Sequence, residues 1–377
     1  MAAQPVAHAA QAELLAGASR DVGRARGLRR AGPVVAHGNR EPAARHAGRD
    51  VERAVAALDP DVLFLDIEMP AERGTDLAAT LPEPRPFIVF ATAYERFAVD
   101  AFQYDPADYL LKPVTRARLQ ATLDRLRQKL AARHEATREV DDAVRAQFFL
   151  LPRTMPDVPG YAVSARTLPA RAVGGDFYDV EFVDDNVAFV LGDVSGKGMA
   201  AGLIASSVQA RWQAAIRQRD LSLASMMTAL NRDVLASTEG SRYATLIHGV
   251  LDPATGEISY VNAGHPPSLL VTNDGRWRPA LASTAPAVGL MHVDEFPAGV
   301  QILAPGETLL VMSDGVCEAR NGAGEEFDLA GLAALAHRSA GTDVSALADA
   351  VVSDVQRHRG ADQAQDDVTV FILRRTA

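Results

Sequence analysis

The chain has 377 residues, of which 48% are apolar, and a formal net charge of −10. This length predicts two or more domains, and the negative charge argues against nucleic acid as a partner. The sequence has no apolar run of the ~18 residues that a membrane-spanning helix needs and no signal-peptide pattern, so we expect a cytoplasmic protein without membrane contact. Cys317 is the only cysteine, which excludes internal disulfides and thiolate metal clusters.

Residues 1–50 are rich in Ala, Arg, Gly and His and lack apolar periodicity, so we expect little order there. From Val51 onward, short helical patterns, including one around Ala98, alternate with apolar strand-like runs. The predicted strands end near Asp66, Thr92 and Leu111. Alternating strands and helices predict a parallel sheet, whose ligands gather at the carboxyl ends of the strands.

Asp66, Thr92 and Lys112 all fall at those carboxyl ends. On these residues and the run Leu-Phe-Leu-Asp-Ile-Glu-Met-Pro, the segment 51–130 resembles the receiver domain of two-component response regulators. The resemblance implies that Asp66 is the phosphoacceptor, that Thr92 and Lys112 assist it, and that a histidine kinase is a partner.

The receiver resemblance is incomplete at its N-terminal side. Receivers begin with an apolar strand ending in an acidic pair that binds Mg²⁺, and nothing before Asp66 supplies either; Asp21 stands in an arginine-rich stretch. Three readings stay open. The segment is a degenerate receiver that serves dimerisation or docking, its first residues come from another reading frame, or Asp66 is a structural residue at a strand end.

Between Thr115 and Phe149 the pattern becomes helical. Leucines recur at spacings of three and four, at positions 119, 123, 126 and 130, with charged residues between them. We expect a long connecting helix, with residues 131–150 as the helical linker, until prolines from Pro152 onward end it. Its apolar seam fits either a coiled-coil homodimer or packing on the chain's own domains.

Residues 151–377 alternate clustered strands with paired helices, which predicts an α/β sandwich with helix pairs outside. The expected strands are 162–166, 188–191, 243–251, 258–262, 268–271, 308–312 and 368–373. The expected helices are 200–217, 223–237 and two between Leu329 and His358.

Several aspartates stand where these strand-like runs meet turn residues, so their carboxylates would project from sheet edges. They are Asp176, Asp193, Asp314, Asp366 and Asp367. Oxygen-only ligands suit Mn²⁺ or Mg²⁺ and disfavour zinc. Two such ions a few ångströms apart can activate one water for attack on a phosphoryl group. The pattern therefore predicts a metal-dependent hydrolase with two ions.

In their order, these motifs resemble the metal-dependent protein phosphatase (PPM) family, in its SpoIIE-type bacterial branch. The loop Asp193-Val-Ser-Gly-Lys-Gly198, the run Asn262-Ala-Gly-His-Pro-Pro and the final Asp366-Asp367-Val-Thr carry the likeness. The resemblance implies an α-β-β-α sandwich. It also implies that Asp193 bridges both ions, the Val194 carbonyl and Asp176 serve the first, and Asp314 with Asp366, ahead of Asp367, holds the second.

The same resemblance implies that Arg171 binds the phosphate and that the substrate is a phosphorylated regulatory protein, such as an anti-anti-sigma factor of the STAS type. Lys197 has two readings, a contact to phosphate or a solvated loop lysine. For His265, in a turn after a strand, a structural hydrogen bond is the simpler expectation. The competing function is a catalytically inert signalling adaptor that binds partners, and a DNA-binding output lacks a basic recognition helix.

Overall fold

In the computed structural model, the residues described are 34–36, 47–69, 73–94, 103–218, 222–339, 341–360 and 366–376. The chain divides into two compact units, 1–138 and 139–377. Most of residues 1–50, for which low order was expected, lie outside the described residues. The same holds for Asp21 and for the segment around Ala98 where a helix was expected. None of the described helices is long and apolar enough to cross a membrane.

The first unit contains a four-stranded parallel sheet in the order β1-β2-β3-β4. Its elements are β1 (Val34–Ala36), α2 (Ala47–Leu58), β2 (Val62–Asp66), α3 (Gly74–Thr80), β3 (Phe87–Thr92) and β4 (Asp108–Leu111). The expectation that no strand precedes Val51 is wrong, because β1 pairs with β2. With three residues, β1 is too short to show an alternating apolar pattern in the sequence. The residues after β1 read His-Gly-Asn-Arg, so they carry no acidic pair.

Helix α5 (Arg116–Phe148) begins in the first unit and continues into the second. Its four periodic leucines, from Leu119 to Leu130, are buried with Val62, Phe64 and Val89 of the first unit's sheet. The helix therefore packs on the chain's own domain in its first half. A homodimer through α5 stays a prediction.

The second unit contains two five-stranded sheets, β11-β10-β13-β14-β5 and β12-β9-β8-β7-β6. The strands are β5 (Tyr161–Leu168), β6 (Asp176–Val183), β7 (Asn186–Val194), β8 (Ala244–Asp252), β9 (Glu257–Ala263), β10 (Ser268–Val271), β11 (Trp277–Ala280), β12 (Gly299–Ile302), β13 (Thr308–Met312) and β14 (Val368–Arg375). The helices are α6 (Met199–Ile216), α7 (Leu223–Thr238), α8 (Asp314–Cys317), α9 (Leu329–Arg338) and α10 (Val344–Arg359).

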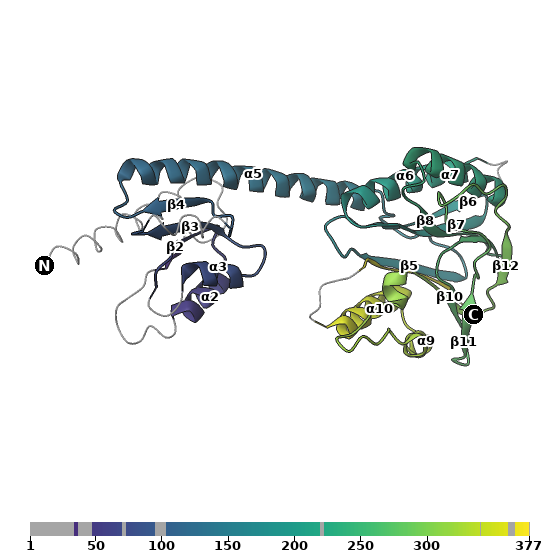
Figure 1. Ribbon diagram of the computed structural model, residues 1–377. Coiled ribbons are helices and arrows are strands. Elements are labelled where there is room, and N and C mark those ends of the chain that lie inside the picture. Colours follow the sequence, from purple (N-terminus) through teal and green to yellow (C-terminus); the bar gives the residue numbers. More distant parts are fainter. Residues whose placement is uncertain are drawn as a thin grey trace, which may run out of the picture. The chain divides into compact units, whose positions relative to one another are not determined.

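The sheets face one another and each carries a helix pair on its outer face (Figure 1). Strand β14 illustrates how a sheet contacts both the other sheet and a helix pair, because its side chains alternate between two cores. Phe371 and Leu373 join the core between the sheets, whereas Val370 and Ile372 join the core under α9 and α10. The α-β-β-α sandwich predicted from sequence is confirmed. The additional strands β6, β11 and β12 were not expected.

Candidate active site

Asp176 and Asp193 lie opposite each other on neighbouring strands. Asp176 begins β6, Asp193 is the penultimate residue of β7, and the two are paired in the antiparallel register. Two glycines precede Asp176 because the chain passes very close to other groups there. A Cβ on Gly174 would lie 2.7 Å from Asp367 Oδ2, and one on Gly175 would lie 2.8 Å from the Val194 carbonyl oxygen.

The other sheet supplies the remaining aspartates. Asp314 is the first residue of α8, directly after β13, and Asp366 and Asp367 directly precede β14. Strands β13 and β14 are paired, and Ser313 N donates to Thr369 O. The strand ends of both sheets therefore bring these carboxylates to one edge of the sandwich.

Electrostatics show that the carboxylates influence one another. Burial raises the pKa of Asp193 to about 7, and the charges of Asp314, Asp366 and Asp367 contribute to this rise. Burial also raises the pKa of Asp176 well above its ordinary value, together with the charges of Asp193 and Asp367. Several buried like charges destabilise the fold unless protons or cations neutralise them.

The donor set fits a hard divalent cation. Asp176 Oδ2 is buried without a hydrogen-bond partner among the described residues, which is costly unless a proton or cation meets it. In the described part of the chain, however, no three His, Cys, Asp or Glu side chains are grouped closely enough to hold an ion. The carboxylates share an edge but are not closed around a common point.

The two adjacent C-terminal aspartates have different surroundings. Asp367 is buried, and its carboxylate accepts hydrogen bonds from the backbone N–H groups of Ala170 (2.7 Å), Gly175 (2.6 Å) and Asp176 (3.3 Å). Asp366 is 40% exposed and pairs with Lys197 at 3.0 Å. Asp367 thus fixes the loop before β6, while Asp366 presents a carboxylate at the surface.

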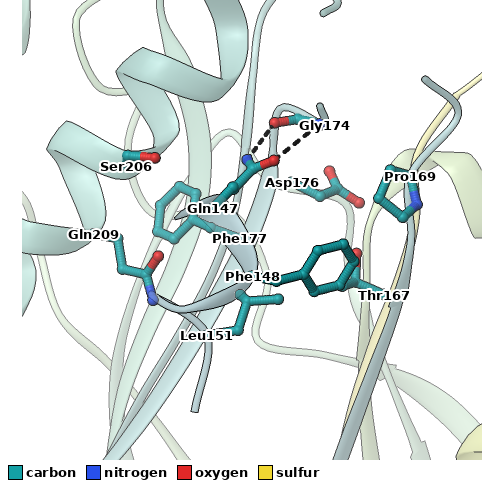
Figure 2. Close-up of a pocket in the computed structure, with 10 residues that line it drawn as sticks. All are labelled: Gln147, Phe148, Leu151, Thr167, Pro169, Gly174, Asp176, Phe177, Ser206 and Gln209. Carbon is teal, nitrogen blue, oxygen red and sulfur yellow. Dashed lines mark hydrogen bonds between the residues drawn. The ribbon is translucent and has the colours of Figure 1, made fainter. Parts of the chain in front are cut away.

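Two positioning residues were missed in the sequence because no motif marks them. Gln147, in the last turn of α5, donates from Nε2 to the Gly174 carbonyl (2.7 Å) and accepts from Gly174 N at Oε1 (3.2 Å), beside Asp176 in a small pocket (Figure 2). Arg359, at the end of α10, donates to the carbonyls of Asp366 (2.9 Å) and Gly315 (2.6 Å). Both hold backbone next to the carboxylates.

Two cationic side chains lie at the rim of this edge. Arg171 is exposed, and its guanidinium passes close to Gly198, with Nη1 3.9 Å from where a Cβ there would lie. Lys197, the neighbour of Gly198 in the loop between β7 and α6, reaches Asp366. Anionic substrate groups would meet positive charge at this rim.

His265 is a structural residue between the sheets. Its ring is buried, with Nδ1 3.0 Å from Thr245 Oγ1 on β8 and Nε2 3.1 Å from the Met312 carbonyl on β13. A neutral ring that accepts at Nδ1 and donates at Nε2 satisfies both contacts. Thr245 is paired with Asp193, and Met312 lies two residues before Asp314. His265 therefore ties together the strand ends that carry the carboxylates.

The buried His265 ring predicts a pH dependence of stability. Burial lowers the pKa of His265 from 6.5 to about 4. Its stabilising contribution is therefore complete above pH 6.5 and decreases by about 1.4 kcal/mol per unit as the pH falls toward 4. His265→Gln should remove this loss. Urea unfolding followed by tryptophan fluorescence at several pH values measures it, because Trp212 and Trp277, the only tryptophans, both lie in the second unit.

The difference in the free energy of unfolding between variant and parent at each pH isolates the contribution of His265, because the acidic groups contribute alike in both proteins. The exposed His292 provides a matched control, since His292→Gln should leave the slope unchanged. Equal slopes for the parent and His265→Gln would contradict the prediction.

The residues predicted for the receiver site also meet. Asp66 ends β2, and its Oδ2 lies 2.5 Å from Lys112 Nζ. Thr92 ends the neighbouring strand β3 and is buried. The carboxyl ends of three adjacent parallel strands thus form one candidate phosphoacceptor site.

Two family models match separate parts of the chain. Residues 183–376 match the family model of Stage II sporulation protein E (SpoIIE), and residues 38–124 match the response regulator receiver domain. The first unit therefore contains a receiver domain. The second unit is a PP2C-like phosphatase domain, which confirms both resemblances seen in the sequence.

Relatives and solved structures fit the same assignment. Protein IcfG of Synechocystis sp. is 30% identical over 63% of this chain and 41% of its own length, and the transcriptional regulatory protein BtsR of Escherichia coli K12 is 54% identical over 20% of the chain and 32% of its own length. The chain thus spans less than half of these curated relatives.

The RsbU and RsbW domains of Rv1364c from Mycobacterium tuberculosis share 30% identity with a TM-score of 0.53, covering 60% of this chain and 63% of that one. The SiaA-PP2C domain of Pseudomonas aeruginosa, at 20% identity and a TM-score of 0.55, covers 65% of this chain and 98% of its own and shows the fold. The SpoIIE model matches more than half of the length of the present chain, and this chain therefore belongs to the SpoIIE family.

Proposed function

We propose that this chain is a metal-dependent protein serine/threonine phosphatase. The observation that carries the proposal is the convergence of Asp176, Asp193, Asp314 and Asp366 from two sheets at one edge, with the pKa values of Asp176 and Asp193 raised by burial and mutual charge. An inert adaptor would have no use for such a destabilising cluster. SpoIIE family membership supports the same activity.

In this proposal, Asp176, Asp193 and the Val194 carbonyl hold one Mn²⁺ or Mg²⁺ ion, and Asp193, Asp314 and Asp366 hold a second. Bound ions would supply an activated water and neutralise charge on the phosphoryl group. Asp367 keeps the backbone before Asp176 in place through its three hydrogen bonds. The Arg171 guanidinium orients the phosphate oxygens.

The experiment combines two measurements on the full chain. Calorimetry with Mn²⁺ should show paired-ion binding, and a phosphoserine protein should release phosphate only when the ion is present. An adaptor would show neither. The substrate that we propose is a phosphorylated regulatory protein of the STAS anti-anti-sigma type. Comparing phosphoproteomes of cells with the wild-type chain and with an Asp193 variant tests it, since phosphoserine on such a protein should accumulate in the variant.

We also propose that a histidine kinase phosphorylates Asp66 and that α5 transmits the receiver's state to the metal site. The contact that supports transmission is the double hydrogen bond from Gln147 to Gly174, two residues before Asp176. The segment after α5 also contacts α6, because Gln209 Nε2 donates to the Leu150 carbonyl (2.8 Å). A change at the end of this helix would therefore reach the backbone that precedes Asp176.

Gln147→Ala should lower metal-dependent turnover by about tenfold or more, because groups that orient metal ligands contribute on that scale. The measurement is the phosphate-release rate as a function of Mn²⁺ concentration. Gln120→Ala is the matched control, since Gln120 lies exposed on the same helix and donates to the exposed Asp124. An unchanged rate in Gln147→Ala would remove the support for transmission through this contact.

A further inference from the structure

The loop between β7 and α6 places a lysine among the carboxylates. Gly196 and Gly198 adopt φ values of 94° and 78°, in the left-handed region that favours glycine, and Lys197 lies between them. Its Nζ is 3.0 Å from Asp366 Oδ2, and each side chain is about 40% exposed. A flexible lysine thus reaches across from one sheet to a carboxylate of the other.

Lysine and a cation compete for the same oxygen. Asp366 Oδ2 accepts a hydrogen bond from Lys197 Nζ. Within the described segments, no three His, Cys, Asp or Glu side chains are grouped closely enough to hold an ion. For Asp366 to ligate an ion through that oxygen, the ammonium has to move away. Two flanking glycines and a four-carbon stem make such movement easy.

We propose that Lys197 is a displaceable internal counterion at the second cation position, released by metal binding to contact the phosphate of the substrate. The inference rests on the proposed function and deepens it. The released ammonium lies on the same rim as Arg171, whose side chain passes close to Gly198. The phosphomonoester dianion would then be held by two cationic side chains.

This arrangement couples the two ligands. Without metal, Lys197 neutralises part of the carboxylate cluster and is occupied, so the substrate phosphate lacks one partner. With metal, the same lysine is available. Metal and phosphorylated substrate should therefore each strengthen the binding of the other, as thermodynamic linkage requires.

The first test is chemical labelling of lysine in the full wild-type chain, read by mass spectrometry. The sequence contains only three lysines, Lys112, Lys129 and Lys197, so each can be quantified separately. Saturating Mn²⁺ should increase acetylation of Lys197 by an amine-reactive ester severalfold relative to Lys129, which is exposed on α5. In Asp366→Asn the increase should disappear. Equal or lower Lys197 labelling with metal bound would overturn the proposal.

The second test is calorimetry on Lys197→Met. Exposed ion pairs contribute little, so removing the competitor should tighten Mn²⁺ binding by about two- to fivefold. The KM for a phosphoserine protein should rise in the same variant, whereas Lys197→Arg should retain part of the substrate binding. Unchanged or weaker metal binding in Lys197→Met contradicts the counterion role.

The two tests separate this inference from the proposed function. If wild-type protein shows no Mn²⁺ binding, the phosphatase proposal itself fails. If Mn²⁺ binds and supports turnover while Lys197 reactivity stays constant, only the counterion role is wrong.

Discussion

Replacement of Asp193 by asparagine is expected to reduce Mn²⁺-dependent phosphate release by more than about a hundredfold. Groups that merely orient metal ligands are worth about 10- to 100-fold, and Asp193 is proposed to bind both ions. The measurement is phosphate release from a phosphoserine protein over a range of Mn²⁺ concentrations. Asp349→Asn is the control, because Asp349 is an exposed aspartate on α10 paired with Arg166. Wild-type turnover in Asp193→Asn would refute the assignment.

In the metal-free protein, Asp193→Asn should increase stability. The pKa of Asp193 is raised from 3.8 to about 7, so its folded form favours the protonated state. Its contribution is therefore favourable below pH 3.8 and is lost as the pH rises toward 7. The asparagine that replaces it carries no charge, and above pH 7 the metal-free variant should unfold at a higher temperature than the parent. Mn²⁺ should stabilise the parent and not the variant.

The second large effect concerns Asp367. Asp367→Ala leaves three backbone N–H groups without their acceptor, two of them on Gly175 and Asp176. We expect the second unit to lose about 2–4 kcal/mol of stability, because the loss of these hydrogen bonds, at about 1–3 kcal/mol for each buried unpaired donor, is partly offset by removal of a charge that repels Asp176 and Asp193. Urea unfolding followed by the fluorescence of Trp212 and Trp277 measures this loss.

Asp366→Ala is the control one residue away. Its exposed pair with Lys197 contributes less than about 1 kcal/mol, so stability should change little while Mn²⁺ affinity falls. If both variants lost the same stability, the two aspartates would not have the separate roles inferred from their contacts.

The sequence predicted the sandwich because its central strands are strongly apolar. Ser268–Val271 and Thr308–Met312 were predicted with their observed bounds. Strand β6 was missed because Asp176 and Asp179 interrupt its apolar pattern. Strand β12 was missed because its four residues, Gly299–Ile302, contain only two apolar side chains in alternation, which is too short a run to stand out in a sequence.

The candidate site was predictable only in part. Asp176, Asp193, Asp314 and Asp366 each stand beside turn residues, and that local signal is visible in the sequence. The contact of Gln147 with Gly174 and that of Arg359 with Gly315 are made across 27 and 44 residues of chain, so no local pattern reveals them. The division of labour between Asp366 and Asp367 likewise depends on which backbone amides lie nearby, and only the fold decides that.

The Gln147 contact makes the rotational phase of α5 significant. Each residue of an α-helix turns the chain by about 100° and advances it by about 1.5 Å. Inserting one residue between Leu130 and Gln147 would rotate Gln147 about the helix axis by roughly that amount relative to Leu130. Inserting seven, close to two full turns, would nearly restore its angle. The length of this segment, more than its composition, therefore sets the face of the helix on which Gln147 follows the four leucines.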